Sequence, residues 1–214
     1  MTMNEEWVNE KLNSLSLKLG IFKPNPYEFY FEPSEKIYEK LESGDEHDLQ
    51  YVATEIARHI GVVYTPTVKY DWGLKMEPEM AGQIRFTTPL HYIQIPFFYV
   101  GKKYALGAIL AHEMTHAFLI SKGIFLNEKN ENEMFTDLAA ICIGLGKLLV
   151  NGQIVVTNGY PSEAHVLGYL SPELIAYCYR KVNIYRSIGS DVATRNLIPE
   201  AENRINHLGL TRLD

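Results

Sequence analysis

The chain has 214 residues, enough for one domain with an added subdomain. Hydrophobic residues make up 46% of it and charged residues 21%, which excludes a disordered chain, a collagen and a disulfide-stabilised miniprotein. The net charge of −6 arises in residues 1–60, which hold 12 acidic and 6 basic residues, whereas residues 61–214 hold 14 of each. Neither part offers the general basic field that a nucleic acid or an anionic membrane surface attracts, so we expect neither as a partner.

Three features bear on the cellular location. Cys142 and Cys178 lie in apolar stretches without Cys-x-x-Cys spacing, which favours a reducing compartment. The first seven residues are acidic at their end and contain no apolar run of the kind that secretory signals have. No stretch of about 18 apolar residues is present, so we expect no membrane-spanning segment and a cytoplasmic protein.

The N-terminal quarter is predicted to be helical. Apolar residues three and four positions apart predict an amphipathic helix over 4–19. Two more helices are expected over 34–42 and 46–60, the second with Asp45 as its N-cap and Gly61 as its end.

Three runs rich in β-branched and aromatic residues follow, and we expect strands over 62–70, 83–87 and 91–100. Pro96 lies inside the third run. Because proline cannot donate to a ladder of hydrogen bonds, that strand is expected to be an edge strand or to end at this residue.

The remaining periodic segments predict helices. Strong helical patterns cover 103–121, which Gly123 stops, and 131–150. A serine cap followed by proline at the first helical position, Ser171 and Pro172, starts a further helix that is expected to run to about residue 187.

The helix over 103–121 contains the sequence His-Glu-x-x-His. Residues His112 and His116 are four positions apart and lie about 40° apart around a helix, so both imidazoles can reach one ion. Glu113 lies about 60° from His116 on the other side, where it can reach a water on that ion but is poorly placed to be a ligand. Two histidines and a carboxylate in an otherwise apolar helix are costly to bury unless a cation compensates them.

A catalytic metal site of this kind needs a third protein ligand. The next predicted helix offers Glu133 and Asp137, which share a face because they are four positions apart, and Ala140 and Gly144 continue that face with small residues. We therefore assign Glu133 as the third ligand and Asp137 as the carboxylate that accepts a hydrogen bond from a ligand histidine. The alternative is that Glu133 belongs to a solvated acidic face, a role that suits Glu131 better because it lies about 200° away on the helix.

These two patterns, His-Glu-x-x-His at 112–116 and Asn-Glu-x-x-x-Asp at 132–137, resemble those of the gluzincin group of zinc metallopeptidases, in its thermolysin-like and minimal members. The resemblance covers about residues 83–140 and implies one zinc ion held by His112, His116 and Glu133. It also implies hydrolysis of peptide or protein substrates, with an endopeptidase favoured over an aminopeptidase because no Gly-Ala-Met-Glu-Asn run is present. Nickel or cobalt could occupy the same ligand set in vitro.

The resemblance also implies roles for the neighbouring residues. Glu113 is the expected general base, which takes a proton from the attacking water and delivers it to the leaving amine. Asp137 is expected to support His112. The family's downstream histidine, which stabilises the transition state, has His165 as its best candidate, and Tyr160 and Tyr169 are further candidates for that role; the alternative for His165 is a structural or surface histidine.

The expected fold class is α+β, with a small mixed sheet whose edge strand lies above the active-site helix, a second ligand-bearing helix, and further helices at both ends. The strand over 91–100 is the one expected to pair with an extended substrate. Three segments are expected: an accessory or covering helical segment over 1–61, the metallopeptidase core over 62–151, and a C-terminal helical segment over 152–214 that completes the domain.

Two alternatives remain at the level of sequence. The chain could be a metal-binding regulatory protein of the same fold that cleaves or binds a single partner. It could also be latent, with residues 1–60 or the tail after residue 187 covering the cleft.

Overall fold

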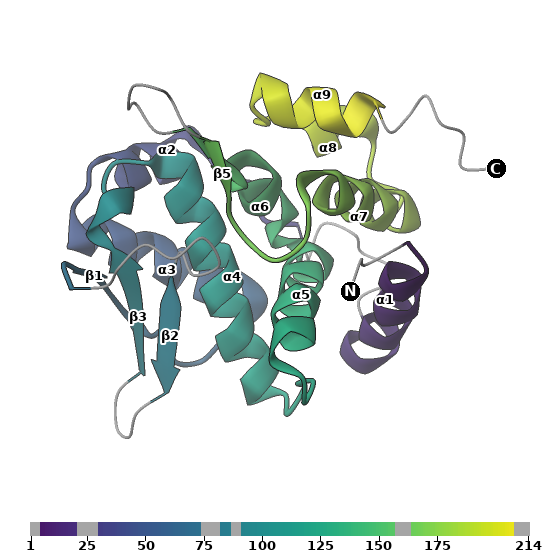
Figure 1. Ribbon diagram of the computed structural model, residues 1–214. Helices are drawn as coiled ribbons and strands as arrows, with labels where there is room; N and C mark the ends of the chain where they lie inside the picture. The colour runs from purple at the N-terminus through teal and green to yellow at the C-terminus, as the bar shows by residue number, and fades with distance from the viewer. Residues whose placement is uncertain (1–4, 21–29, 74–81, 87–90, 157–163, 208–214) are drawn as a thin grey trace.

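The computed structural model describes residues 5–20, 30–73, 82–86, 91–156 and 164–207, and it confirms a mixed α+β fold (Figure 1). The described elements in chain order are α1 (Glu5–Leu19), α2 (Glu35–Glu42), α3 (Glu46–Ile60), β1 (Thr67–Asp71), β2 (Gln83–Phe86), β3 (His91–Pro96), α4 (Lys103–Ser121), α5 (Lys129–Ala140), α6 (Gly146–Gly152), β4 (Ile154–Val156), β5 (Ala164–Val166), α7 (Pro172–Tyr185), α8 (Ser190–Thr194) and α9 (Pro199–His207). In this part of the chain, no helix combines the length and apolar character needed to cross a bilayer.

Local capping explains where several helices begin and end. The Asp45 carboxylate accepts hydrogen bonds from the backbone of the first turn of α3, and Gly61 ends that helix in the left-handed conformation, with φ of 72°. Ser171 caps α7, and Pro172 occupies its first turn. These boundaries agree with the prediction because each is set by residues that are neighbours in sequence.

The three-stranded sheet is mixed and has the order β1-β3-β2. β1 pairs parallel with β3, and β2 pairs antiparallel with β3, with Ile84 opposite Ile93. The strand β3 ends at Pro96, which was one of the two expectations for this run. The other expectation, that β3 is an edge strand, was wrong, because β3 lies in the centre of the sheet. Pro96 is the last residue of β3, and a proline at that position leaves the preceding ladder intact. The edge strand that lies along α4 is β2 (Figure 1).

The single helix expected over 131–150 is divided. α5 leads into a π-helical segment, Ile141–Leu145, in which Gly144 has a φ of 96°, and α6 then starts in a new direction. The change in direction lays α6 closely against α4: a Cβ atom added at Gly152 would lie 2.0 Å from the carbonyl oxygen of Tyr104. The close approach to α4 therefore occurs at Gly152, in α6.

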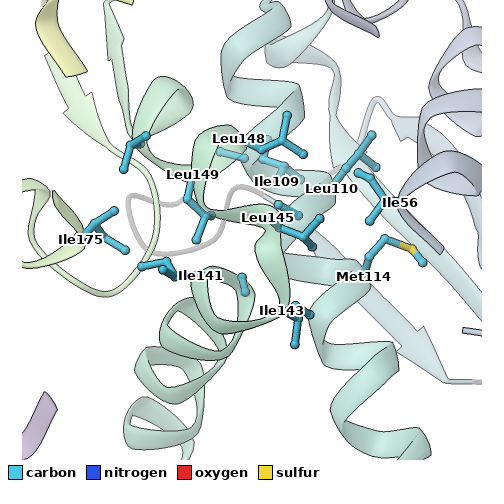
Figure 2. Close-up of a cluster of buried hydrophobic side chains, with 14 of the residues drawn as sticks. Ile56, Ile109, Leu110, Met114, Ile141, Ile143, Leu145, Leu148, Leu149 and Ile175 are labelled. Atoms are coloured by element: carbon cyan, nitrogen blue, oxygen red, sulfur yellow. The ribbon is translucent and has the colours of Figure 1, made fainter. Parts of the chain in front are cut away.

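One hydrophobic core joins the elements around α4. Figure 2 shows side chains from α3, α4, the π-helical segment, α6 and α7 packed together. Leu106, Leu110 and Met114 of α4 are fully buried, and Val8 and Leu12 of α1 belong to the same cluster. The segments before and after the sheet thus contribute directly to the core that holds α4.

Further helices were expected in the C-terminal part, but two features of it were not predicted in detail. β4 and β5 form a second, two-stranded antiparallel sheet in which Val155 lies opposite His165. Beyond α7, the short helix α8 and the helix α9 follow, and α9 packs against α7 through the buried Ala201 and Ile205.

Candidate metal centre

Two neighbouring helices bring three side chains to one point. α4 supplies His112 and His116, which face the same way because they are one helical turn apart, and α5 supplies Glu133. The Nε2 atoms of the two histidines are 3.1 Å apart, and Oε2 of Glu133 lies 3.1 Å from Nε2 of His112 and 2.8 Å from Nε2 of His116. Among the described residues, this is the one His, Cys, Asp and Glu group that could hold a metal ion.

The dimensions of this triangle match a small metal site. Ligand atoms about 2.0–2.1 Å from a tetrahedral zinc lie about 3.3 Å from one another. The observed separations of 2.8 to 3.1 Å are slightly shorter, so a small outward movement of the side chains would accommodate such an ion. The three side chains are 12–17% exposed, which leaves one side of the group open.

Asp137 determines which nitrogen of His112 carries hydrogen. Its Oδ1 lies 2.8 Å from Nδ1 of His112, and the residue is only 1% exposed. An ionised carboxylate can only accept hydrogen bonds, so Nδ1 of His112 is the donor. In the neutral imidazole, Nε2 then presents a lone pair to the centre of the triangle.

Thr136 determines which nitrogen of His116 carries hydrogen, and the sequence analysis did not predict this role. Its hydroxyl donates to the carbonyl of Asn132 at 2.9 Å, so its oxygen accepts from Nδ1 of His116 at 3.3 Å. Nε2 of His116 is then also a lone-pair atom. A signal did exist in the sequence, since Thr136 follows Glu133 by three positions and therefore shares its side of α5.

The centre of the group accordingly favours positive charge. When both imidazoles are neutral, two lone pairs and a carboxylate oxygen face one another, and such acceptors repel unless a metal ion or a proton lies among them. Burial lowers the pKa of His112, but its contacts with Asp137 and Glu133 outweigh burial and hold that pKa well above its ordinary value. Burial raises the pKa of Glu133, but the two histidines more than offset it, so the net shift is downward. The donor set thus fits a metal cation.

Glu113 lies beside this group without joining it. Its carboxylate is 5% exposed, and its Oε2 accepts a hydrogen bond of 2.9 Å from the backbone N–H of Ile84 in β2. A Cβ atom added at Gly82 would lie 3.2 Å from Oε1 of Glu113, so the backbone at Gly82 comes close to this carboxylate. Burial is the largest influence on Glu113 and raises its pKa, although the adjacent histidines partly oppose that shift. A carboxylate with a raised pKa accepts a proton more readily.

The metal group and Glu113 line one cavity of about 300 Å³. β2 forms one wall, α4 and α5 contribute the polar groups, and the segment after β5 forms another wall. Next to the polar groups, the cavity is lined by the apolar side chains of Ala108, Ile109, Leu149, Leu167 and Ile175. The cavity therefore combines a cation-binding group, a buried carboxylate and space for an apolar group.

The other residues considered from sequence are placed differently. His165 does not line this cavity; its Nε2 lies 3.2 Å from the hydroxyl of Tyr99, and its ring contacts Phe98. Burial lowers its pKa, with a smaller contribution from Lys102. Tyr169 lines the cavity and its ring stacks against His112, with centroids 5.9 Å apart. Tyr160 lies outside the described residues.

Comparison with known proteins gives no relative: no family model, no curated protein and no solved structure matches this chain. The interpretation of the site therefore depends on its own geometry.

Proposed function

We propose that this chain is a zinc-dependent peptidase that hydrolyses peptide bonds within extended segments of protein substrates. The observation that carries the proposal is the triangle of acceptor atoms from His112, His116 and Glu133 with the buried carboxylate of Glu113 beside it in one cavity. The resemblance of both sequence patterns to the gluzincin peptidases supports the same reaction.

The donor set favours zinc. Two imidazole nitrogens and one carboxylate oxygen are the three protein ligands of many catalytic zinc sites, and they leave a fourth position for water or substrate. When bound, zinc would supply Lewis acidity toward a water molecule and a substrate carbonyl. Asp137 and Thr136 would keep the Nε2 lone pairs of His112 and His116 available to such an ion.

Glu113 is the residue that moves protons. Its carboxylate takes a proton from the attacking water and then delivers it to the nitrogen of the leaving amine. The hydrogen bond from the Ile84 N–H fixes the position of Oε2, and burial raises the pKa of Glu113 toward that of an effective base. Because this hydrogen bond comes from β2, the edge strand also positions the base.

The substrate is proposed to lie along β2. Among the described strands, β2 pairs only with β3, so the backbone groups on its other edge, apart from the Ile84 N–H that donates to Glu113, are proposed to pair with an extended peptide. A peptide placed there passes over the cavity, and the side chain next to the cleaved bond faces Ile109, Leu149 and Leu167. This arrangement favours substrates with an apolar residue at that position.

The test compares the zinc-loaded wild type with Glu113→Gln on an unfolded protein such as reduced casein. Both proteins are expected to bind one zinc ion, while the variant loses about 10²- to 10⁴-fold in rate. Equal rates would contradict the role of Glu113. A zinc-loaded wild type that leaves unfolded substrates intact would contradict general proteolysis, and a single partner retained by Glu113→Gln in a pulldown would then favour the regulatory alternative.

A further inference from the structure

One wall of the cavity is hydrogen-bonded to the same carboxylate that contacts His112. Asp137 uses its two oxygens differently: Oδ1 contacts Nδ1 of His112, while Oδ2 accepts from the backbone N–H of Tyr169 at 2.8 Å and of Leu170 at 3.1 Å. Asp137 is 1% exposed, so these three donors replace the water that would otherwise solvate it. The residue therefore joins α5, a proposed metal ligand and the segment that follows β5.

Gly168 makes this attachment sterically possible. Its φ of 86° lies in the left-handed region, and a Cβ atom added there would lie 3.0 Å from Oδ2 of Asp137. A side chain at this position would both strain the backbone and push the carboxylate away from the two N–H groups. The turn thus requires glycine for the carboxylate to reach the backbone.

Gln153 holds the two ends of the same segment from the other side. Its backbone carbonyl accepts from the N–H of Leu167 at 2.7 Å, and its Nε2 donates to the carbonyl of Leu170 at 2.8 Å. Gln153 is 3% exposed, and it is the residue directly after the end of α6. Residues 167–170 are consequently held by Asp137 within the segment and by Gln153 at both ends.

The held segment faces the cavity. Leu167, Gly168 and Tyr169 all line it, and the ring of Tyr169 stacks on the imidazole of His112. A change in the position of His112 is therefore transmitted to this wall by two routes, the stacked ring and the carboxylate of Asp137.

We propose that Asp137 and Gly168 are positioning residues for the substrate cavity, and that residues 167–170 form a wall whose order is coupled to metal occupancy. This inference rests on the proposed metal site and extends it from the ion to the shape of the cavity. An ion bound to Nε2 of His112 would hold the imidazole in one position, so that its Nδ1–H stays on Oδ1 of Asp137 and Oδ2 stays directed at the wall. By thermodynamic reciprocity, a ligand that orders the wall strengthens metal binding to the same degree.

Hydrogen exchange of the backbone amides of Tyr169 and Leu170 measures this coupling without any assay of activity. In the wild type, zinc is expected to slow exchange at these amides about tenfold relative to protein treated with a chelator. Asp137→Asn keeps an oxygen that accepts from His112 but replaces Oδ2 with an amide nitrogen that cannot accept. This variant is expected to bind zinc and to lose the zinc-dependent protection. Asp191→Asn, at an exposed position in α8, is the matched control and keeps the wild-type response.

Gly168→Ala is the second variant, because it replaces neither a proposed metal ligand nor Asp137. It is expected to speed exchange at Tyr169 and Leu170 about tenfold and to weaken zinc binding in proportion. Equal zinc-dependent protection in the wild type and Asp137→Asn, or no zinc-dependent change in a zinc-loaded wild type, would overturn the coupling while leaving the peptidase proposal intact. Failure of the wild type to bind zinc would overturn both.

Discussion

Thr136 offers the sharpest test of how the metal group is organised. Thr136→Val keeps the shape of a fully buried side chain but removes the oxygen that accepts from Nδ1 of His116. The imidazole of His116 is then free to move its hydrogen to Nε2, which would face the ion. We expect weaker metal binding with little change in the fold, because the hydroxyl's other partner, the carbonyl of Asn132, lies within the same helix.

The size of the loss in metal affinity can be estimated from the residues that hydrogen-bond to the two histidines, Thr136 and Asp137. Loss of such a partner weakens metal binding about 10- to 100-fold. The Thr136 hydroxyl is neutral and lies 3.3 Å from His116, whereas Asp137 is charged and lies 2.8 Å from His112. Thr136→Val is therefore expected at the low end, about tenfold or about 1.4 kcal/mol, and Asp137→Ala at the high end, about 100-fold.

Competition with a chromophoric chelator gives both affinities directly. Thr136→Ser restores the oxygen and is the matched control, with an expected affinity close to that of the wild type. Nitrogen-15 chemical shifts of the metal-free protein report the tautomer, and a mixture is expected at His116 only in Thr136→Val. The reasoning is refuted if the valine variant binds zinc as tightly as the wild type, or if the serine variant binds as weakly as the valine variant.

Further predictions concern stability. Zinc at 100 times its dissociation constant is expected to stabilise the fold by about 2.7 kcal/mol. In thermal melts, the Tm with zinc should therefore be about 5–10 °C higher than the Tm with chelator, and His112→Ala should remove this difference in Tm. Gly152→Ala places a methyl group against the Tyr104 carbonyl, so chemical denaturation is expected to show a loss of about 3 kcal/mol or more; an unchanged midpoint would contradict the α4–α6 contact. Lys147→Met removes the buried ammonium that donates to Val192 at 2.8 Å, and a loss of about 1–3 kcal/mol is expected in the same assay.

Sequence predicted those parts of the fold that depend on near neighbours. The caps Asp45 and Ser171 identified helix starts because a cap is a contact between residues within one turn. Gly144 was placed inside one helix over 131–150, on the face that continues from Glu133 and Asp137. Its left-handed conformation instead turns the chain, and its carbonyl accepts from the N–H of Phe31, more than a hundred positions earlier. Periodicity within one segment contains no information about such a contact.

The candidate site also contains some features that local sequence spacing predicted and others that depend on contacts between distant segments. His112, His116 and Glu133 converge because helical spacing fixes their relative directions within α4 and α5, and one packing contact between the helices completes the group. The position of β3 in the sheet depends on strand order, which no local pattern contains, so the edge was assigned to the wrong strand. His165 was considered on residue type alone, and β5 places it against Tyr99 instead of in the cavity.

The N-terminal helix bears on whether the chain is latent. α1 does not line the cavity; it packs against α5, where Trp7 and Lys11 both contact Glu131 at 3.0 Å, two positions before the proposed ligand Glu133. Its inner face contributes further residues, which are fully or almost fully buried: Val8, Leu12 and Leu15.

Removal of α1 is therefore expected to unfold the protein and not to activate it. Burying three large apolar side chains contributes about 5–9 kcal/mol, at 1.5–3 kcal/mol each, which is comparable with the whole stability of a typical domain. Deletion of residues 1–19 should lower Tm sharply and abolish zinc binding, measured by thermal melts and elemental analysis. A truncated chain that stayed folded and cleaved casein faster than the full chain would show that α1 covers the site, and it would contradict the supporting role that its contacts with α5 indicate.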